Sequence, residues 1–266
     1  MRLALFFMAF CWLPFSLSGA AAQTPQERAQ IEWAEQRGRL IYDMDGAAWV
    51  GTDDALARVP DARNQNIRGY IVERDGSGFT VTFYAGAVEA PVAVYRGYVE
   101  NRAVLRREVY PAESRPALTA MQRRLAAARG LVRSLGRRPC GEQPFNTVIV
   151  PAETADGSID LYLLTPQANR NEWPAGGHFR ATISAAGTVE SSRAFTNTCI
   201  ALGGGQNSAG LIVTHLLDPI PTEIHVFTAL SAGIPLYVAT NSPDRVWEID
   251  GGRIRLVEDR PQRSGS

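Results

Sequence analysis

Short runs of β-branched and aromatic residues, separated by glycine-containing turns, fill most of the chain after residue 67 and constrain its fold more than any other feature. In the stretch 69–84, apolar runs flank Asp75-Gly76-Ser77-Gly78, which is a strong β-hairpin signal. Similar runs follow at 92–99 and 103–110, and again from residue 146 to residue 258, where hairpin turns are expected at Ala185-Ala186-Gly187 and at Gly251-Gly252. We therefore expect a mainly β (α+β) protein built from two antiparallel β-meander halves.

Two helices are predicted beside the strands. Thr24-Pro25-Gln26-Glu27 has the form of a helix N-terminus, and the short helix that follows should end near Gly38. Residues 39–50 are interpreted as a strand, a turn and a second short element. A second, amphipathic helix begins with a capping box of Thr119 and Gln122, ends at Gly136 and joins the two halves. Its apolar stripe consists of Met121, Leu125, Ala128, Val132 and Leu135.

The two halves share a pattern that suggests a distant internal repeat. GYIV at 69–72 resembles GLIV at 210–213. Without gaps, Phe83, Ala85, Pro91 and Val94 coincide with Phe227, Ala229, Pro235 and Val238. The alternative is that any two β-meanders share such a pattern. The predicted organisation is an N-terminal meander at 23–113, a connecting helix at 114–138, a C-terminal antiparallel β domain at 139–260 and a disordered tail at 261–266.

The first 22 residues have the features of an export signal. Arg2 precedes an apolar run from Leu3 to Leu17, and Ala20 and Ala22 fit a small-residue cleavage rule before Gln23. The run is too short for a spanning helix, so cleavage after Ala22 is favoured over an uncleaved anchor. No later segment is long enough to span a membrane. The mature protein is therefore expected to be periplasmic or secreted.

Cys140 and Cys199 remain after cleavage and are expected to form a disulfide, because an even pair in an exported protein usually does. The alternative, a cysteine nucleophile beside a histidine, requires a reduced thiol in an oxidising compartment. Basic and acidic residues are balanced at 27 each, so no net positive field favours nucleic acid.

All three histidines, His178, His215 and His225, lie in the second half of the chain. Three imidazoles can hold zinc with a fourth position open to water, with Asp218 or Glu223 as the catalytic carboxylate. Residues 214–227, THLLDPIPTEIHVF, are predicted to form a hairpin with its turn at 218–221. A four-residue turn places His215 and His225 on opposite faces of that hairpin, whereas three or five residues place them on one face. The residue pattern favours structural roles for the three histidines over a metal site.

Several stretches together resemble a family of uncharacterised exported proteins of Gram-negative bacteria. They are PFNTVIVP, LYLLTPQ, GGHFRATI, AFTNTC and THLLDPIPTEIHVF, which span most of residues 139–255. In that family Cys140 and Cys199 match a cysteine pair, and the three histidines fall within its motifs. The resemblance implies export and cysteine pairing, and it implies no activity, substrate or cofactor.

The expected function is therefore non-catalytic binding, or a role associated with the cell envelope, and no cofactor is expected. The partner would be a small molecule, a glycan or an envelope protein. Among the aromatic residues, Trp173, followed by Pro174 and close to Gly176-Gly177, is the best candidate for a stacking platform on a loop. The alternative function is a His-based, zinc-dependent hydrolase. A binding module should instead show an apolar groove, an open sheet edge or an aromatic platform.

Overall fold

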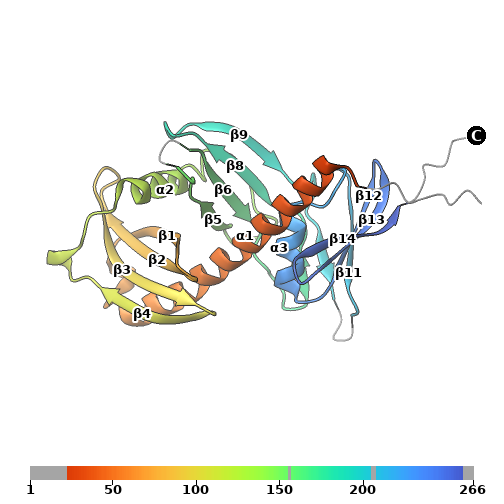
Figure 1. The fold of residues 1–266 in the computed structure, drawn as a ribbon. Helices are drawn as coiled ribbons and strands as arrows, with labels where there is room; N and C mark the ends of the chain where they lie inside the picture. Colours follow the sequence, from red (N-terminus) through yellow and green to blue (C-terminus); the bar gives the residue numbers. More distant parts are fainter. Residues whose placement is uncertain (1–22, 155–156, 205–207, 260–266) are drawn as a thin grey trace, which may run out of the picture.

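The structure is a computed structural model that describes residues 23–154, 157–204 and 208–259. The predicted leader and the predicted tail lie outside the described residues. Within these ranges the chain forms three four-stranded sheets, one two-stranded sheet and three α-helices. The predicted mainly β (α+β) class is thus confirmed. Figure 1 shows one long helix that runs between a sheet at one end of the molecule and a sheet at the other.

This long helix, α1 (Pro25–Arg58), has 34 residues, so the prediction of a short N-terminal helix is wrong. It begins as expected, with Thr24 and Glu27 in a reciprocal capping box. The helix continues through residues 39–50, where a strand and a turn were predicted. Its buried residues recur at helical spacing along almost the whole length, and they are Ile31, Ala34, Glu35, Gly38, Ile41, Met44, Gly46, Ala47, Ala48, Gly51 and Ala55.

The glycines of α1 allow close packing and do not end the helix. A Cβ atom at Gly38 would lie 2.5 Å from the Cβ of Val226 in α3 (Glu223–Ala232), so the two helices touch at this point. A Cβ atom at Gly51 would lie 3.0 Å from the Val81 side chain. The destabilisation of a glycine within a helix, about 1 kcal/mol, is therefore offset by contacts with two separate partners.

The first sheet is an antiparallel meander in chain order, as predicted. Its strands are β1 (Ile67–Asp75), β2 (Gly78–Gly86), β3 (Pro91–Glu100) and β4 (Ala103–Val109). Short 3-10 turns, η1 (Ala62–Asn64) and η2 (Ala112–Ser114), flank it. Val81 and Tyr95 pack with residues of α1, whereas Ile71 and Tyr84 pack with residues of α2 (Ala120–Gly130), so a helix covers each face.

Helix α2 begins with the predicted capping box of Thr119 and Gln122. It ends at Gly130 and not at Gly136, because residues 131–136 fold into turns. Leu125 and Ala128 are buried against the meander and the second sheet, as the apolar stripe predicts.

The second sheet is antiparallel in the order β5-β6-β8-β9. Its strands are β5 (Asn146–Val150), β6 (Ile159–Leu164), β8 (Phe179–Ile183) and β9 (Val189–Ala194). The predicted hairpin turn at 185–187 connects β8 to β9. Two short strands, β7 (Glu172–Pro174) and β10 (Ala201–Gly203), pair beside this sheet. Residues of α1, the meander, β5, β6 and α3 share one core, so the two predicted halves are packed together.

The C-terminal sheet contains β11 (Leu211–His215), β12 (Leu236–Asn241), β13 (Asp244–Asp250) and β14 (Arg253–Asp259). Strands β11 and β12 are parallel, and α3 crosses between them. The predicted hairpin at residues 214–227 is therefore wrong. Parallel neighbours need a crossover connection, and Thr222 caps the helix that makes it. The turn at Gly251-Gly252 joins β13 to β14 as predicted.

The predicted internal repeat is unconfirmed. Phe83 lies in β2, whereas its matched residue Phe227 lies in α3, so the aligned positions differ in secondary structure. In the described part of the chain, no helix is both long enough and apolar enough to cross a membrane.

Candidate functional site

The three histidines are all buried, and two of them meet. His215 ends β11 and His225 lies in the first turn of α3. Their ring centroids are 4.5 Å apart in an edge-to-face arrangement. His178, just before β8, contacts the ring of Phe227 instead, at 6.2 Å between centroids. The end of β11 and the first turn of α3 thus bring His215 and His225 together. The predicted hairpin would have required a turn of three or five residues to do so.

Backbone groups occupy both ring nitrogens of His178. The Thr165 N–H donates to Nδ1 at 3.2 Å, and Nε2 lies 3.0 Å from the carbonyl oxygen of Pro174. Burial lowers the pKa of His178 to about 4, although the Pro174 carbonyl opposes the shift. The neutral ring thus satisfies one donor and one acceptor of the main chain. To bind a metal ion, His178 would have to give up one of these partners.

His215 belongs to a small ionic network. Its Nε2 atom lies 2.8 Å from Oδ2 of Asp218, and Arg193 donates to both oxygens of that carboxylate, at 3.2 and 2.6 Å. Burial alone would raise the pKa of Asp218, but the hydrogen bonds from His215 and Arg193 outweigh it and hold the pKa well below the ordinary value. Asp218 is thus an ion-pair partner, which makes it a poor proton acceptor.

The other predicted carboxylate, Glu223, is also paired. Its Oε1 atom accepts from Arg180 at 2.9 Å and from the Tyr162 hydroxyl at 3.2 Å. Burial raises the pKa of Glu223, and Arg180 opposes that shift. Each predicted catalytic carboxylate therefore has its own arginine.

His225 caps the helix in which it lies. The Thr222 N–H donates to its Nδ1 atom at 3.0 Å, so His225 takes the place that glutamate or glutamine has in a capping box. Burial, and next the neighbouring His215, hold the pKa of His225 well below its ordinary value. Across residues 23–154, 157–204 and 208–259, no three His, Cys, Asp or Glu side chains are grouped so that they could hold a metal ion. The zinc site stays a prediction.

Cys140 and Cys199 form the predicted disulfide, with Cα atoms 5.6 Å apart. The bond ties the segment after α2 to the segment before β10. Gly177 packs against it, because a Cβ atom there would lie 2.1 Å from the Cys140 sulfur. Residues 142–144 follow directly after Cys140 and form one wall of a groove, so the disulfide anchors that wall.

This groove has a volume of about 880 Å³ and lies among α1, α3, β7 and the segments 142–146 and 165–168. We call it the aromatic groove. Its aromatic side chains are Tyr42, Trp49, Trp173 and Phe227, and its polar and charged side chains include Asp45, Arg102, Glu142, Gln143, Asn146 and Gln167. A concave site of several hundred Å³, lined by aromatic rings and a few polar groups, is the usual form of a small-molecule site.

One face of α1 supplies the centre of the aromatic groove. Tyr42, Asp45 and Trp49 are spaced by three and four residues, so they project from the same side of the helix. Trp49 is 57% exposed, which is a large fraction for a tryptophan side chain. Trp173, the aromatic residue singled out from the sequence, contributes to the same groove from β7.

Asp45 is the least expected residue in the aromatic groove. Its carboxylate is partly buried, and among the described residues it has neither a hydrogen bond nor an ion pair. Burial raises the pKa of Asp45 to about 6, although the charge of Arg102 opposes the shift. A carboxyl group that is desolvated but unpaired, in a concave site, is typical of a functional position.

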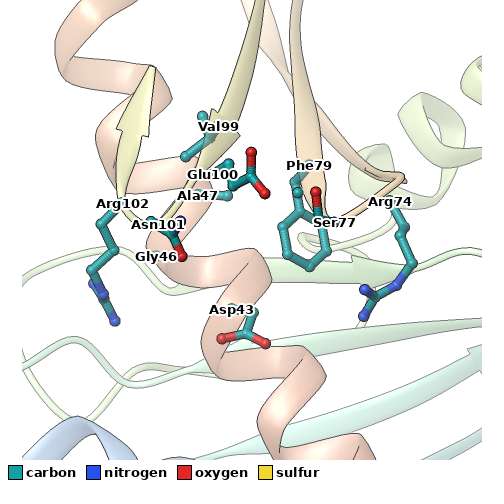
Figure 2. A pocket seen from close by; sticks show the side chains of 11 residues that line it. Asp43, Gly46, Ala47, Arg74, Ser77, Phe79, Val99, Glu100, Asn101 and Arg102 are labelled. Carbon is teal, nitrogen blue, oxygen red and sulfur yellow. The ribbon is translucent and has the colours of Figure 1, made fainter. Parts of the chain in front are cut away.

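A second cavity, of about 480 Å³, lies between α1 and the turns of the meander. Figure 2 shows the side chains that line it. Asp43 lies at its α1 side, with Arg74 and Arg102 on either side of it in this view. Arg102 and Gly46 line both this cavity and the aromatic groove, so the two hollows meet at these residues. Burial raises the pKa of Asp43, while Arg74 and Arg102 oppose that shift.

Asp45, Trp49 and Arg102 were not predicted as site residues. Tyr42, Asp45 and Trp49 fall in residues 39–50, which were interpreted as a strand, a turn and a second short element. The signal that identifies them is the spacing of Tyr42, Asp45 and Trp49, which is evident only once the segment is recognised as helical. Arg102 had no such signal, since it reaches the groove from a turn that is distant in sequence.

Comparison with known protein families, curated proteins and solved structures finds no match for this chain. The resemblance to exported proteins of Gram-negative bacteria therefore stays a prediction.

Proposed function

We propose that this protein is an exported, non-catalytic binding protein whose ligand is a saccharide held in the aromatic groove. The observation that carries the proposal is the face of α1 that presents Tyr42, Asp45 and Trp49 together to one groove, with Trp173 beside them. Aromatic rings stack on the C–H faces of sugar rings, while carboxylates and amides accept and donate hydrogen bonds with sugar hydroxyl groups.

The polar side chains of the aromatic groove support this ligand class. Gln143, Asn146 and Gln167 carry amides, each with donors and an acceptor. Asp45 has no partner within the described residues, so a ligand hydroxyl group would supply the hydrogen bond that it lacks. A volume of about 880 Å³ suits an oligosaccharide of a few sugar units better than a single small ion.

The location follows from the predicted leader and from the disulfide. A disulfide between Cys140 and Cys199 persists in an oxidising compartment, which agrees with export to the periplasm or beyond. Glycans of the cell envelope and its surroundings are accessible there. The zinc-dependent hydrolase remains the alternative function, and metal analysis of protein purified without chelator or nickel resin tests it.

A glycan array followed by titration calorimetry tests the proposal. The array carries neutral and acidic oligosaccharides of bacterial and plant origin, and the protein is the mature chain from Gln23. We expect Trp49→Ala to weaken binding by about tenfold or more, because aromatic anchors in a groove carry much of the affinity.

Trp33→Ala is the matched control. Trp33 is also an exposed tryptophan of α1, at 41%, but it lies outside the aromatic groove and contacts Arg37 and Arg180. Its loss should leave saccharide binding unchanged. Equal weakening by both substitutions, or no binding of any oligosaccharide, would contradict the proposal.

A further inference from the structure

Arg102 occupies a backbone position that rarely suits arginine. It is the second residue of the two-residue turn between β3 and β4, where Glu100 pairs with Ala103. Asn101 and Arg102 both have positive φ angles, 49° and 58°. Glycine is the usual residue at the second position of such a turn. Residues held in sparsely populated conformations persist where the surroundings fix them, and they concentrate at functional sites.

Two residues of α1 hold the guanidinium group of Arg102. The group lies over the ring of Tyr42, 4.7 Å from its centroid. Gly46 lets it approach the helix, because a Cβ atom there would come within 3.1 to 3.3 Å of three guanidinium atoms. Figure 2 shows Arg102 beside Gly46 at the edge of the second cavity. Tyr42 and Gly46 both line the aromatic groove, so the guanidinium group is placed at its rim.

No carboxylate of the described residues forms an ion pair with Arg102, although Asp43 and Asp45 are near enough for its charge to act on them. Arg107, five residues further along the same hairpin, behaves differently and pairs with Asp54 at 2.9 Å. The hydrogen-bond donors of Arg102 are thus available at the rim of the aromatic groove. Stacking on Tyr42 restricts the conformations of the side chain. A pre-oriented guanidinium group of this kind suits a planar anion.

We infer, on the basis of the proposed function, that Arg102 binds a carboxylate of the ligand and that the ligand is an acidic saccharide, of the class that contains uronic acids. Two parallel N–H···O hydrogen bonds from one guanidinium group match the geometry of a carboxylate. The sugar ring next to that carboxylate would then lie towards Tyr42 and Trp49.

The charges of the aromatic groove favour a carboxylate over a phosphate. Its charged side chains are Arg102, Asp45 and Glu142, one cation and two acids. A single guanidinium group can pair with the one negative charge of a carboxylate through two hydrogen bonds. A phosphate monoester with nearly two negative charges would face two carboxylates with one cation, and like charges at short range repel.

The test compares each bound acidic oligosaccharide with its carboxyl-reduced counterpart, in which the carboxylate is a hydroxymethyl group. Calorimetry is done with the mature wild-type chain, Arg102→Gln and Arg106→Gln. Arg106 is the matched control, because it stacks on Tyr98 at 4.6 Å and lies outside the aromatic groove. Should Arg102→Gln fold poorly, Arg102→Gly replaces it, since glycine is the preferred residue at this turn position.

We expect the wild type and Arg106→Gln to bind the acidic form about tenfold or more tightly than the reduced form, because a charge-assisted hydrogen bond contributes that much to affinity. Arg102→Gln should bind both forms equally, with unchanged affinity for the reduced form. Survival of the preference in Arg102→Gln, equal binding by the wild type, or a preference for sugar phosphates would overturn the inference and leave saccharide binding standing. Absence of all saccharide binding would overturn both.

Discussion

The buried histidines and the aromatic groove both adjoin α3, since His225 lies in this helix and Phe227 lines the groove, but they differ in how their polar groups are paired. His178, His215 and His225 each have a hydrogen-bond partner within the chain. In the aromatic groove, Asp45 and Arg102 have no such partner among the described residues. Asp45 is partly buried and Arg102 is exposed, so their polar atoms stay available to form hydrogen bonds, whereas ring nitrogens of all three histidines are occupied.

The two regions also show opposite consequences of burial. Burial lowers the pKa of His178 to about 4 and raises the pKa of Asp45 to about 6, and in both cases it favours the neutral form. The neutral form of His178 is satisfied by the backbone, whereas the carboxylate of Asp45 is not satisfied by the protein. The neutral forms of His178 and His225 are therefore compatible with the fold at neutral pH, whereas the ionised form of Asp45 destabilises it. Three measurements test this contrast.

The largest effect is expected for His178→Ala. The substitution leaves the Thr165 N–H and the Pro174 carbonyl without partners and opens a cavity in the core. We expect the free energy of unfolding to fall by about 4 kcal/mol, measured by urea denaturation at pH 8. Arg106→Gln is the surface control and should change it by less than about 0.5 kcal/mol. A loss below about 1 kcal/mol for His178→Ala would show that water replaces the ring at little cost.

A somewhat smaller effect is expected from acid. The folded-state pKa of His178, about 4, lies below the unfolded value of 6.5, so the unfolded chain binds more protons between these pH values. Stability from His178 is therefore complete above pH 6.5 and lost as the pH falls towards 4, by about 3 kcal/mol. His225 acts in the same direction.

Urea denaturation at pH 8 and at pH 4.5 measures this loss. Protonation of Asp45 raises the stability of the fold as the pH falls, which opposes the loss from His178. The wild type is therefore compared with His178→Gln, whose amide cannot titrate. The wild type should lose more stability than the variant over this range. The assignment fails if the two proteins lose the same amount.

The smallest effect is expected for Asp45→Asn, and its sign is reversed. The folded-state pKa of Asp45, about 6, lies above the unfolded value near 3.8, so above pH 6 the ionised group destabilises the fold. The neutral amide removes this penalty and should stabilise the protein at pH 8 by roughly 2 kcal/mol, and by almost nothing at pH 3.5. Saccharide binding should weaken at the same time, as expected where function costs stability.

Thermal and urea unfolding of Asp45→Asn beside the wild type check this prediction. Destabilisation at pH 8 would mean that Asp45 has a structural partner, and the aromatic groove would then resemble the buried histidines.

Much of the fold follows from local sequence patterns. The meander β1–β4, the capping boxes at Thr24 and Thr119, and the turns at 75–78 and 251–252 are predicted because their signals lie within a few residues. The extent of α1 is not predictable in this way. Gly38 and Gly46 look like helix ends until their partners, Val226 and Arg102, are known. The same applies to α3, where His225 takes the capping role usually filled by glutamate.

Some residues of the candidate site can also be predicted from local sequence, whereas others cannot. Trp173 stood out from its loop sequence, and the Cys140–Cys199 bond, which anchors one wall of the aromatic groove, follows from cysteine count and predicted export. The shared helix face of Asp45 and Trp49 can be predicted only if residues 39–50 are assigned to a helix. Arg102 needed the packing of a turn against α1, which no local pattern contains.

Local sequence patterns are thus sufficient to predict the β-rich class, the main turns, two helix starts and the disulfide, since each depends on short-range backbone preferences or on a single pair of residues. Contacts between distant parts of the chain are needed to explain why α1 continues past its glycines and why α3 is a helix. The same contacts bring together the residues of the aromatic groove, which include Tyr42, Asp45, Trp49, Arg102 and Trp173. Close packing stabilises residues that are unfavourable for the local secondary structure, such as glycines within a helix. The residues that provide this packing lie far away in the chain, so a local pattern does not contain them.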